Sequence, residues 1–273
     1  MNEVTIYILT HKKFNEKYDK ELYKPLLNGS YFINEELNYI KDNTGDNISE
    51  LNPYYAELTG QYWAWKNSES DIIGFNHYRR WFVRNLKFDK LTKKDIINDL
   101  KNNDIILPQK VRFKTSLKET TIELLKLYPN YGAKWEDYLK LEQVIKQYYP
   151  EYLESYYHIM NSNSYHNNNM FICNMKLADK YFTWLFDILK IMENEIDFSK
   201  YPEYNKRALG FLSETLLNVF VIKNNLKVKK RWIFISGSKM PILFVIGRRF
   251  PRIGNLINLI SKKIYALNKK AFK

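Results

Sequence analysis

Two groups of polar side chains follow short apolar segments of this sequence. Thr10 and His11 come directly after residues 4–9, which alternate in polarity and are rich in β-branched side chains, as in a strand. The second group follows residues 71–76 and consists of His77, Tyr78, Arg79 and Arg80. Ligands of open α/β sheets bind beyond the carboxyl ends of the strands. Because guanidinium groups match phosphate oxygens in a two-pronged fork, the arginine pair predicts a diphosphate site, with a solvated or salt-bridged turn as the alternative.

A third candidate lies in an apolar stretch at residues 205–224, which we expect to be helical. Glu214 stands among leucines there, and a buried carboxylate needs either a partner or a function. Arg207 precedes Glu214 by seven residues, or about two helical turns. The two side chains are therefore expected on one face, and a structural ion pair is the alternative to a functional site.

Several common sites have no support in the sequence. It contains no glycine-rich phosphate loop of either common spacing, no His-Glu-x-x-His zinc pattern and no Gly-x-Ser-x-Gly elbow. The four histidines are scattered, so nothing favours a hydrolase triad. Cys173 is the single cysteine, which excludes a disulfide within the chain and a cysteine metal cluster. No metal ligand set is therefore assigned.

The elements that must position these residues alternate between strand and helix. Strands are expected at 4–9, 71–76, 104–107, 168–175 and 226–235. Helices are expected at 54–66, 92–102, 176–195 and 205–224 and over most of 115–160, whereas residues 15–52 read as irregular. Asn52-Pro53 starts the first helix, and Thr92 with Asp95 forms a capping box for the second. This order predicts an α/β protein with a mostly parallel central sheet flanked by helices.

Charge separates the chain into two parts. The formal net charge is +13, yet residues 215–273 contain 14 Lys and Arg and no acid, so the first 214 residues are near neutral. Residues 253–267 carry a helical apolar stripe. We therefore expect a folded domain at 1–235 and a basic amphipathic helical tail at 236–273, which binds an anionic membrane surface through 241–273. A terminal helix packed on the core or on a partner subunit is the alternative.

The distribution of charged and apolar residues also limits the binding partners and the cellular location that we expect for this protein. A nucleic-acid enzyme would spread basic residues across its working cleft, so a neutral body argues against nucleic acid. The start of the sequence lacks the features of a signal peptide, and no apolar run reaches 18 residues. We expect a cytoplasmic protein, peripheral at the inner face of the cell membrane. The aromatic helix at 54–66 is expected to form core or the wall of a base or sugar pocket.

Six segments of the sequence resemble one bacterial family. They are Asp46–Ser49, Asn52–Thr59, Tyr62–Asn67, Ile73–Arg80, Asn169–Ile172 and Gly210–Glu214. The family was long labelled as of unknown function, occurs in capsule and exopolysaccharide clusters, and its members are regarded as glycosyltransferases. The resemblance covers roughly residues 4–232 and implies a GT-A-like, Rossmann-like fold with a UDP-sugar donor such as UDP-galactose. This chain has Ala56 where the family often has Cys, and Thr215 where it often has Arg.

The resemblance also suggests roles for individual residues. Glu214 would act as the general base or hold the acceptor hydroxyl, and the other catalytic candidates are His77, Arg79 and Arg80. The donor would contact Thr10, His11, Asn47, Tyr62, Lys66, Tyr78 and Arg207. The acceptor or sugar would meet Asn168, Asn169 and Ser213.

The sequence has no convincing Asp-x-Asp element. We therefore expect no cofactor and metal-independent transfer to a glycan or lipid-linked glycan, with Mn²⁺ or Mg²⁺ dependence as the alternative. A non-catalytic nucleotide-sugar-binding component of a polysaccharide assembly complex is the rival function.

Overall fold

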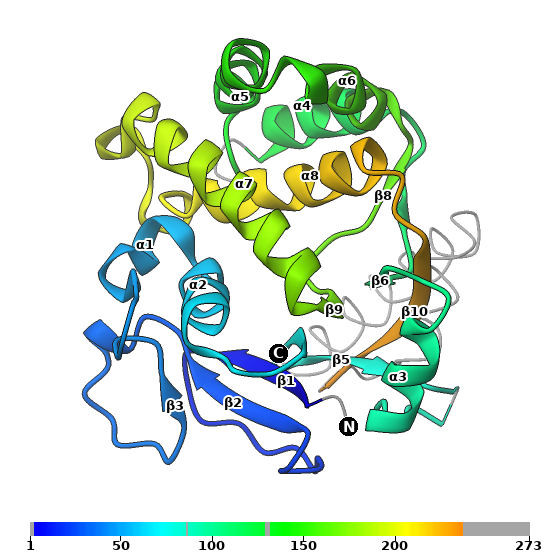
Figure 1. Ribbon diagram of the computed structural model, residues 1–273. Helices are drawn as coiled ribbons and strands as arrows, with labels where there is room; N and C mark the ends of the chain where they lie inside the picture. The colour runs from blue at the N-terminus through cyan, green and yellow to red at the C-terminus, as the bar shows by residue number, and fades with distance from the viewer. Residues whose placement is uncertain (1–2, 86, 129–131, 237–273) are drawn as a thin grey trace, which may run out of the picture.

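The computed structural model describes residues 3–85, 87–128 and 132–236. Its main sheet has eight strands in the order β3-β2-β1-β4-β5-β10-β6-β9, and β9 also pairs with β4 (Figure 1). The strands are β1 (Val4–Thr10), β2 (Tyr23–Leu27), β3 (Ile40–Lys41), β4 (Ile72–His77), β5 (Arg80–Val83), β6 (Ile105–Pro108), β9 (Ile172–Asn174) and β10 (Val228–Ile235). A separate two-stranded sheet joins β7 (Val111–Arg112) to β8 (Ser164–Tyr165).

The sheet is mixed, so the expectation of a mostly parallel sheet is wrong. Strands β1, β2, β3 and β4 are parallel to their neighbours in that run, as is the β6–β10 pair. The β4–β5, β5–β10, β4–β9 and β6–β9 pairs are antiparallel. The length of the link between β4 and β5 explains why this pair is antiparallel: it consists of only two residues, Tyr78 and Arg79. So short a link reaches only an antiparallel partner, because a parallel one needs a crossover of a dozen or more residues.

Helices cover the two faces of the sheet unequally. The α-helices are α1 (Asn52–Tyr55), α2 (Leu58–Asn67), α3 (Lys93–Leu100), α4 (Leu117–Leu127), α5 (Trp135–Tyr148), α6 (Leu153–Asn161), α7 (Met175–Glu195) and α8 (Ala208–Lys223). In Figure 1, α4, α5 and α6 lie at the top, α7 and α8 lie beneath them, and the sheet is lowest. Helix α3 packs through Ile96 into the smaller core on the opposite face of the sheet.

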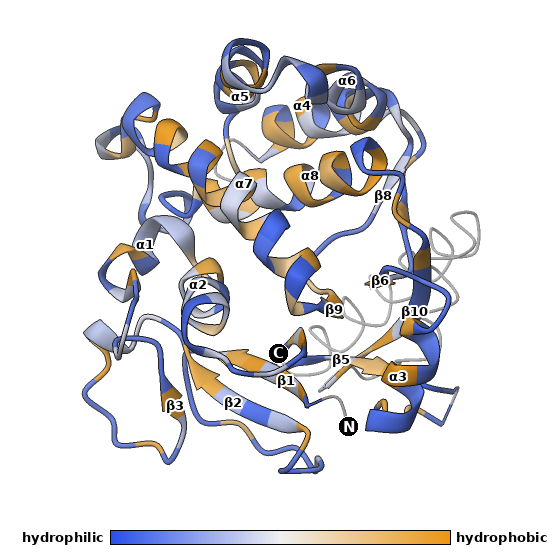
Figure 2. Cartoon of the chain, in the orientation of Figure 1, coloured by the Kyte–Doolittle hydropathy of each residue, from blue (hydrophilic) through white to orange (hydrophobic). Residues whose placement is uncertain are grey.

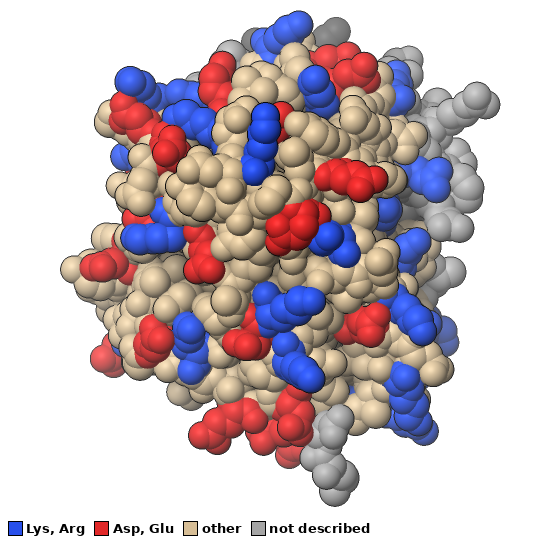
Figure 3. All heavy atoms as spheres, turned by 45° about the horizontal axis from the view of Figure 1, so that its top comes forward, with Lys and Arg blue, Asp and Glu red and all other residues tan. Residues whose placement is uncertain are grey.

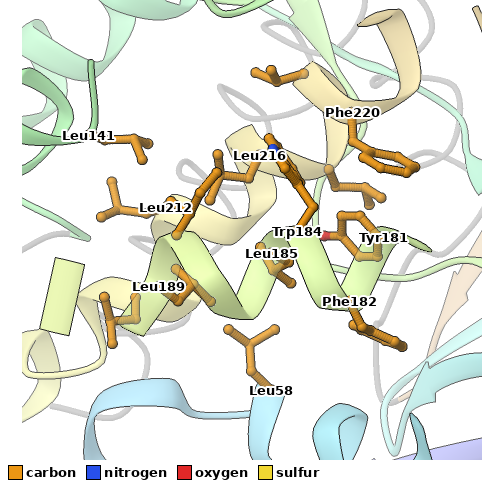
Figure 4. Packing of buried hydrophobic residues seen from close by; sticks show 14 of the residues in the cluster. Leu58, Leu141, Tyr181, Phe182, Trp184, Leu185, Leu189, Leu212, Leu216 and Phe220 are labelled. Carbon is orange, nitrogen blue, oxygen red and sulfur yellow. The ribbon is translucent and has the colours of Figure 1, made fainter. Parts of the chain in front are cut away.

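Alternation along β1 explains the two cores. Tyr7 and Leu9 enter the larger core with α2 and α7, whereas Ile6 and Ile8 enter the smaller one. Helix α8 is apolar over most of its surface, as the orange ribbon in Figure 2 shows, because other helices surround it. Figure 4 shows side chains of α7 and α8 meeting there, with Trp184 and Leu185 beside Leu212 and Leu216.

The helices and strands compared here lie where the sequence predicts them more often than they have the predicted boundaries. The Thr92–Asp95 capping box is confirmed at the start of α3. The helix expected at 54–66 is instead two helices, broken at Ala56, where φ is 51°. The strand expected at 168–175 begins only at Ile172 because Asn168 and Asn169 have φ of 73° and 48°. Strand β2 lies in a segment that reads as irregular, since Pro25 stands at its centre.

A buried carboxylate holds the loop after β2 against α2. Asp42 is fully buried and accepts hydrogen bonds from five groups: the backbone N–H groups of Gly29 and Ser30 and the hydroxyls of Ser30, Ser49 and Thr59. Charge-assisted hydrogen bonds of this kind are roughly twice as strong as neutral ones. The carboxyl end of β2 is thereby fixed relative to the start of α2.

The basic tail expected at 236–273 lies, except for Ser236, outside the described residues. None of the helices within the described residues combines the length and the apolar character that a bilayer crossing requires. On the face shown in Figure 3, basic and acidic side chains are interspersed, in agreement with the near-neutral body inferred from the sequence.

Candidate functional site

The carboxyl ends of β1 and β4 lie side by side, as expected for the two polar groups. The strands are parallel with Leu9 opposite His77, and the backbone N–H of Tyr78 donates to the Leu9 carbonyl at 3.1 Å. The rings of His11 and Tyr78 meet edge to face with their centres 5.3 Å apart. Thr10 is buried, and its hydroxyl donates to the Lys12 carbonyl at 2.6 Å. This bond fixes the turn that presents His11.

Three cations surround the His11–Tyr78 contact, and we call Lys12, Arg79 and Arg207 the cationic group. The Lys12 ammonium and the Arg79 guanidinium each lie 5.5 Å from the centre of the Tyr78 ring. Partial burial and then the charges of Lys12, Arg79 and Arg207 lower the pKa of His11. Within the described residues, no carboxylate oxygen lies within 4.0 Å of a charged nitrogen of these three side chains. Their positive charge is therefore available to an anionic ligand.

Arg207 is held by aromatic rings rather than by an acid. Its guanidinium carbon lies 3.7 Å from the centre of the Tyr204 ring and 5.4 Å from that of Phe211. Its Nε is buried and has no hydrogen-bond partner in the described part of the chain. The ion pair with Glu214 that the sequence left open is not formed. Arginine stacks readily on aromatic faces, which orients the guanidinium while leaving its other nitrogens free.

Glu214 lies on the inner side of α8, where two other segments reach it. Its Oε2 accepts a hydrogen bond from the Tyr165 hydroxyl at 3.2 Å. Burial, followed by the negative charge of Glu57, raises the pKa of Glu214 to about 7. The backbone N–H of Asn168, the Tyr165 hydroxyl and the charge of Arg80 act in the opposite direction. A carboxyl group with a pKa near neutrality exchanges protons readily at physiological pH, as general acid–base catalysis requires.

Glu57, which the sequence left without a role, faces the same region. Its Oε1 accepts a hydrogen bond from the Asn169 side-chain amide at 2.8 Å. The same amide donates to the Gly210 carbonyl of α8 at 2.9 Å. Asn169 is fully buried and bridges the start of α2 to α8, which places it behind Glu57. The side-chain amide of Asn169, expected to contact a sugar, makes these two hydrogen bonds within the protein in this structure.

His77 completes the group at the end of β4. Its Nε2 lies 2.8 Å from the Asn168 carbonyl, and because a carbonyl only accepts, Nε2 carries the hydrogen. Burial lowers the pKa of His77, Glu57 opposes this and Arg80 reinforces it. The ring is therefore neutral at pH 7. Arg79 and Arg80 act on different partners, since Arg79 lies near His11 while Arg80 lies near His77 and Glu214.

Four residues expected in the site make their observed contacts elsewhere. The Tyr62 hydroxyl donates to Asp46, and the Lys66 ammonium lies 3.4 Å from the centre of the Trp65 ring. Asn47 shapes its own turn through Gly45 and Ser49. Ser213 is fully buried and its hydroxyl donates to the Gly210 carbonyl, so no ligand reaches it in this structure.

Side chains of the kinds that bind metals do not gather in threes in the part of the chain that the structure describes. No group of three or more His, Cys, Asp or Glu side chains converges in this part of the chain as metal ligands would. The acids nearest the site, Glu57 and Glu214, are engaged by Asn169 and Tyr165 instead.

Comparison with known proteins finds one matching sequence family and one similar solved structure for this chain. Residues 5–225 match the sequence profile of a family described as a domain of unknown function, DUF4422. The apo structure of WbbM, described as a bifunctional glycosyltransferase, is 27% identical, with a TM-score of 0.73 over 87% of this chain and 46% of that chain. This chain therefore corresponds to less than half of that enzyme. A comparison with curated protein sequences finds no match.

Proposed function

The chain belongs to the DUF4422 family, and on that premise we propose that it is a glycosyltransferase. It transfers a hexose, galactose in particular, from a UDP-sugar to a growing, lipid-linked surface glycan. The likeness to a bifunctional glycosyltransferase supports the class of reaction. The donor, the sugar and the acceptor follow from the family resemblance of the motifs, including Gly210–Glu214.

One observation carries the proposal: cations that form no ion pair among the described residues and a carboxyl group of raised pKa occur at the same edge of the sheet. The cationic group offers three positive charges beside the ends of β1 and β4. Glu214, whose pKa is about 7, lies with His77 and Arg80 at the end of β4. A nucleotide-sugar donor needs cations at its diphosphate and a base near its anomeric carbon. Both are supplied here by side chains on different elements.

The reaction follows from these positions. The acceptor oxygen forms a bond to the anomeric carbon, while the bond from that carbon to the phosphate oxygen breaks and its electron pair leaves with UDP. The acceptor proton passes to the Glu214 carboxylate, or Glu214 orients the hydroxyl by a hydrogen bond. The guanidinium groups of Arg79, Arg80 and Arg207 stabilise the negative charge that grows on the diphosphate. We propose that this charge compensation makes the transfer independent of a divalent metal.

The roles at the nucleoside follow the order of the elements. His11 follows β1 and contacts the nucleoside, and the Tyr78 ring stands beside it, while the buried Thr10 fixes the turn that presents His11. Because Ser213 and Asn169 are buried, Asn168 is the remaining candidate for contact with the acceptor.

The tail at 241–273 holds the protein at the inner face of the cell membrane. Removing it is expected to abolish binding to vesicles that contain anionic lipid and to leave donor binding intact.

The experiment is a binding and transfer assay with matched arginine variants. UDP, UDP-galactose, UDP-glucose and GDP-mannose are compared by thermal shift, since a ligand of the native state raises the apparent stability. Transfer is then measured with EDTA or Mn²⁺. Arg79→Ala is expected to weaken UDP-sugar binding by at least about tenfold, through loss of a charge-assisted contact worth roughly 1.5–3 kcal/mol.

Arg84→Ala is the matched control, because Arg84 is an exposed arginine that follows the other end of β5 and has its Nε 3.8 Å from Asp95 Oδ2. It should bind as wild type does. Equal effects of both substitutions would contradict the proposed diphosphate site. Activity lost in EDTA and restored by Mn²⁺ would contradict metal independence. Binding of UDP-sugar with neither transfer nor hydrolysis would instead identify a non-catalytic binding component.

A further inference from the structure

Backbone strain is concentrated around Glu57. Within the described residues, five residues other than glycine have positive φ: Ala56, Phe88, Asn168, Asn169 and Asn225. Ala56 immediately precedes Glu57, and Asn169 donates a hydrogen bond to its carboxylate. Each such residue costs of order 1–3 kcal/mol and persists only where its surroundings enforce it. Three of the five, Ala56, Asn168 and Asn169, therefore lie in the two turns that adjoin the Glu57 carboxylate. Backbone strain of this kind is characteristic of functional sites.

The Asn168-Asn169 turn uses its polar groups to hold the site together. The Asn168 carbonyl accepts from His77, and the Asn168 backbone N–H contacts the Glu214 carboxylate. The Asn169 amide donates to Glu57 and to Gly210, and the Asn169 carbonyl accepts from Gln61 at 2.7 Å. With both residues left-handed, the carbonyls and amides of this turn reach partners on β4, on α2 and the residue before it, and on α8. Asparagine tolerates this conformation better than most residues.

The Asn52–Ala56 turn holds Glu57 from the other side. The Ala56 backbone N–H donates to the Asn52 carbonyl at 2.8 Å, and the Asn52 side-chain amide donates to the Ala56 carbonyl at 2.7 Å. This turn approaches α8 closely at Gly210. A Cβ at that glycine would lie 3.4 Å from the Ala56 Cβ and 3.8 Å from Glu57 Oε2. Gly210 and Glu214 are four residues apart and share one face of α8, so Glu57 is directed at the face that carries Glu214.

We propose that Glu57 is a positioning residue for Glu214, held by the two strained turns so that its carboxylate faces the side of α8 that carries Glu214. The inference rests on the proposed function, because it assigns the acid–base role to Glu214. Glu57 itself takes no part in bond formation. Its negative charge raises the proton affinity of the Glu214 carboxylate, which makes that carboxylate a stronger base toward the acceptor hydroxyl.

The charges facing Glu214 from each neighbouring segment are consistent with this role. Glu57 at the start of α2 opposes ionisation of Glu214. Arg80 of β5, the Tyr165 hydroxyl of β8 and the Asn168 backbone N–H favour it. His77 of β4 is neutral and contributes little charge. Among these neighbours, Glu57 is thus the carboxylate that opposes ionisation of Glu214.

The test is a direct titration that does not depend on transfer. Glutamate side-chain carboxyl carbons are labelled with ¹³C, and the Glu214 resonance is assigned by its absence in Glu214→Gln. In Glu57→Gln we expect the pKa of Glu214 to fall by roughly one unit or more, because a like charge has been removed. An unchanged Glu214 titration in Glu57→Gln would overturn the proposal.

A second variant protects the test against misfolding. Asn169→Ala keeps the charge of Glu57 but removes its hydrogen-bond donor, so the pKa of Glu214 should fall by a smaller amount than in Glu57→Gln. Asn225→Ala is the matched control, since Asn225 is also left-handed, with φ 50°, but follows α8 at its far end. It should leave the Glu214 titration unchanged. A shift as large in Asn225→Ala as in Asn169→Ala would show a general effect of destabilisation and overturn the proposal.

The pH dependence of transfer separates this inference from the proposed function. If the protein transfers sugar, the acidic limb of the kcat profile should move to lower pH in Glu57→Gln by the same amount as the Glu214 titration. A Glu214 titration that shifts in Glu57→Gln, in a protein that transfers no sugar, would retain the role of Glu57 and refute the glycosyltransferase proposal. Transfer with an unmoved profile would retain the enzyme and refute the role of Glu57.

Discussion

Replacing Glu214 with glutamine should stabilise the protein at alkaline pH while removing the proposed base. Burial and the nearby charge of Glu57 raise the pKa of Glu214 from its ordinary value of 4.5 to about 7. The folded state thus binds the proton more tightly than the unfolded state does. Below pH 4.5 the group is protonated in both states and imposes no penalty, and the penalty grows as pH rises from 4.5 to 7.

The magnitude follows from the size of the shift. A difference of about 2.5 pKa units corresponds to roughly 3 kcal/mol, fully expressed above pH 7. Glutamine is neutral at every pH and can still accept from Tyr165 through its carbonyl. We therefore expect Glu214→Gln to raise the free energy of unfolding by up to about 3 kcal/mol at pH 8 and by little at pH 4.5. For a chain of this size the melting temperature should rise by roughly 6–12 °C at pH 8.

The assay is urea denaturation of wild type and variant at several pH values between 4.5 and 8. The difference in the free energy of unfolding should grow with pH and level off above 7. Glu69→Gln is the control, because Glu69 is exposed and its removal should give no such trend. A pH-independent difference between wild type and Glu214→Gln would refute the account of Glu214 as a carboxyl group that is buried at a cost. Near-normal turnover of the variant would remove Glu214 from the catalytic role.

Two further predictions concern the framework. Asp42→Asn should lower the free energy of unfolding by about 3 kcal/mol, because a buried charge that accepts five hydrogen bonds is lost, whereas the exposed Asp46→Asn should have little effect in the same denaturation series. Gly60→Ala should destabilise by roughly 1–3 kcal/mol, since its new Cβ would lie 2.3 Å from Asn28 Oδ1. Gly210→Ala, also within a helix, should instead be neutral or stabilising by up to about 1 kcal/mol, since its Cβ meets only ordinary contacts. The opposite order of the two glycine variants would contradict the packing described for α2 and α8.

Several features of the fold were predictable because they depend on neighbours in the chain. The β-branched segment at 4–9, the apolar segments before His77 and Pro108, and the capping box at Thr92 are local patterns, and each forms the expected element. Strand direction was not predictable in this way. It depends on which strand pairs with which, and the sheet is mixed because β5, β9 and β10 add antiparallel partners.

The amino-acid sequence was enough to identify the residues of the site that can carry charge and to place them just after the ends of their strands. His11, Tyr78 and Arg79 meet because parallel neighbours end at one edge, which a pattern of strand ends can reveal. The contacts that Arg207 and Glu214 make depend on the three-dimensional packing of the chain. It left Arg207 stacked on Tyr204 rather than paired with Glu214. It also brought Glu57 to Glu214 through a turn at Asn168-Asn169, more than a hundred residues from Glu57 in the chain. Proximity of that kind arises from the packing of α1 against α8 and of α2 against α7, and no local preference of the sequence encodes it.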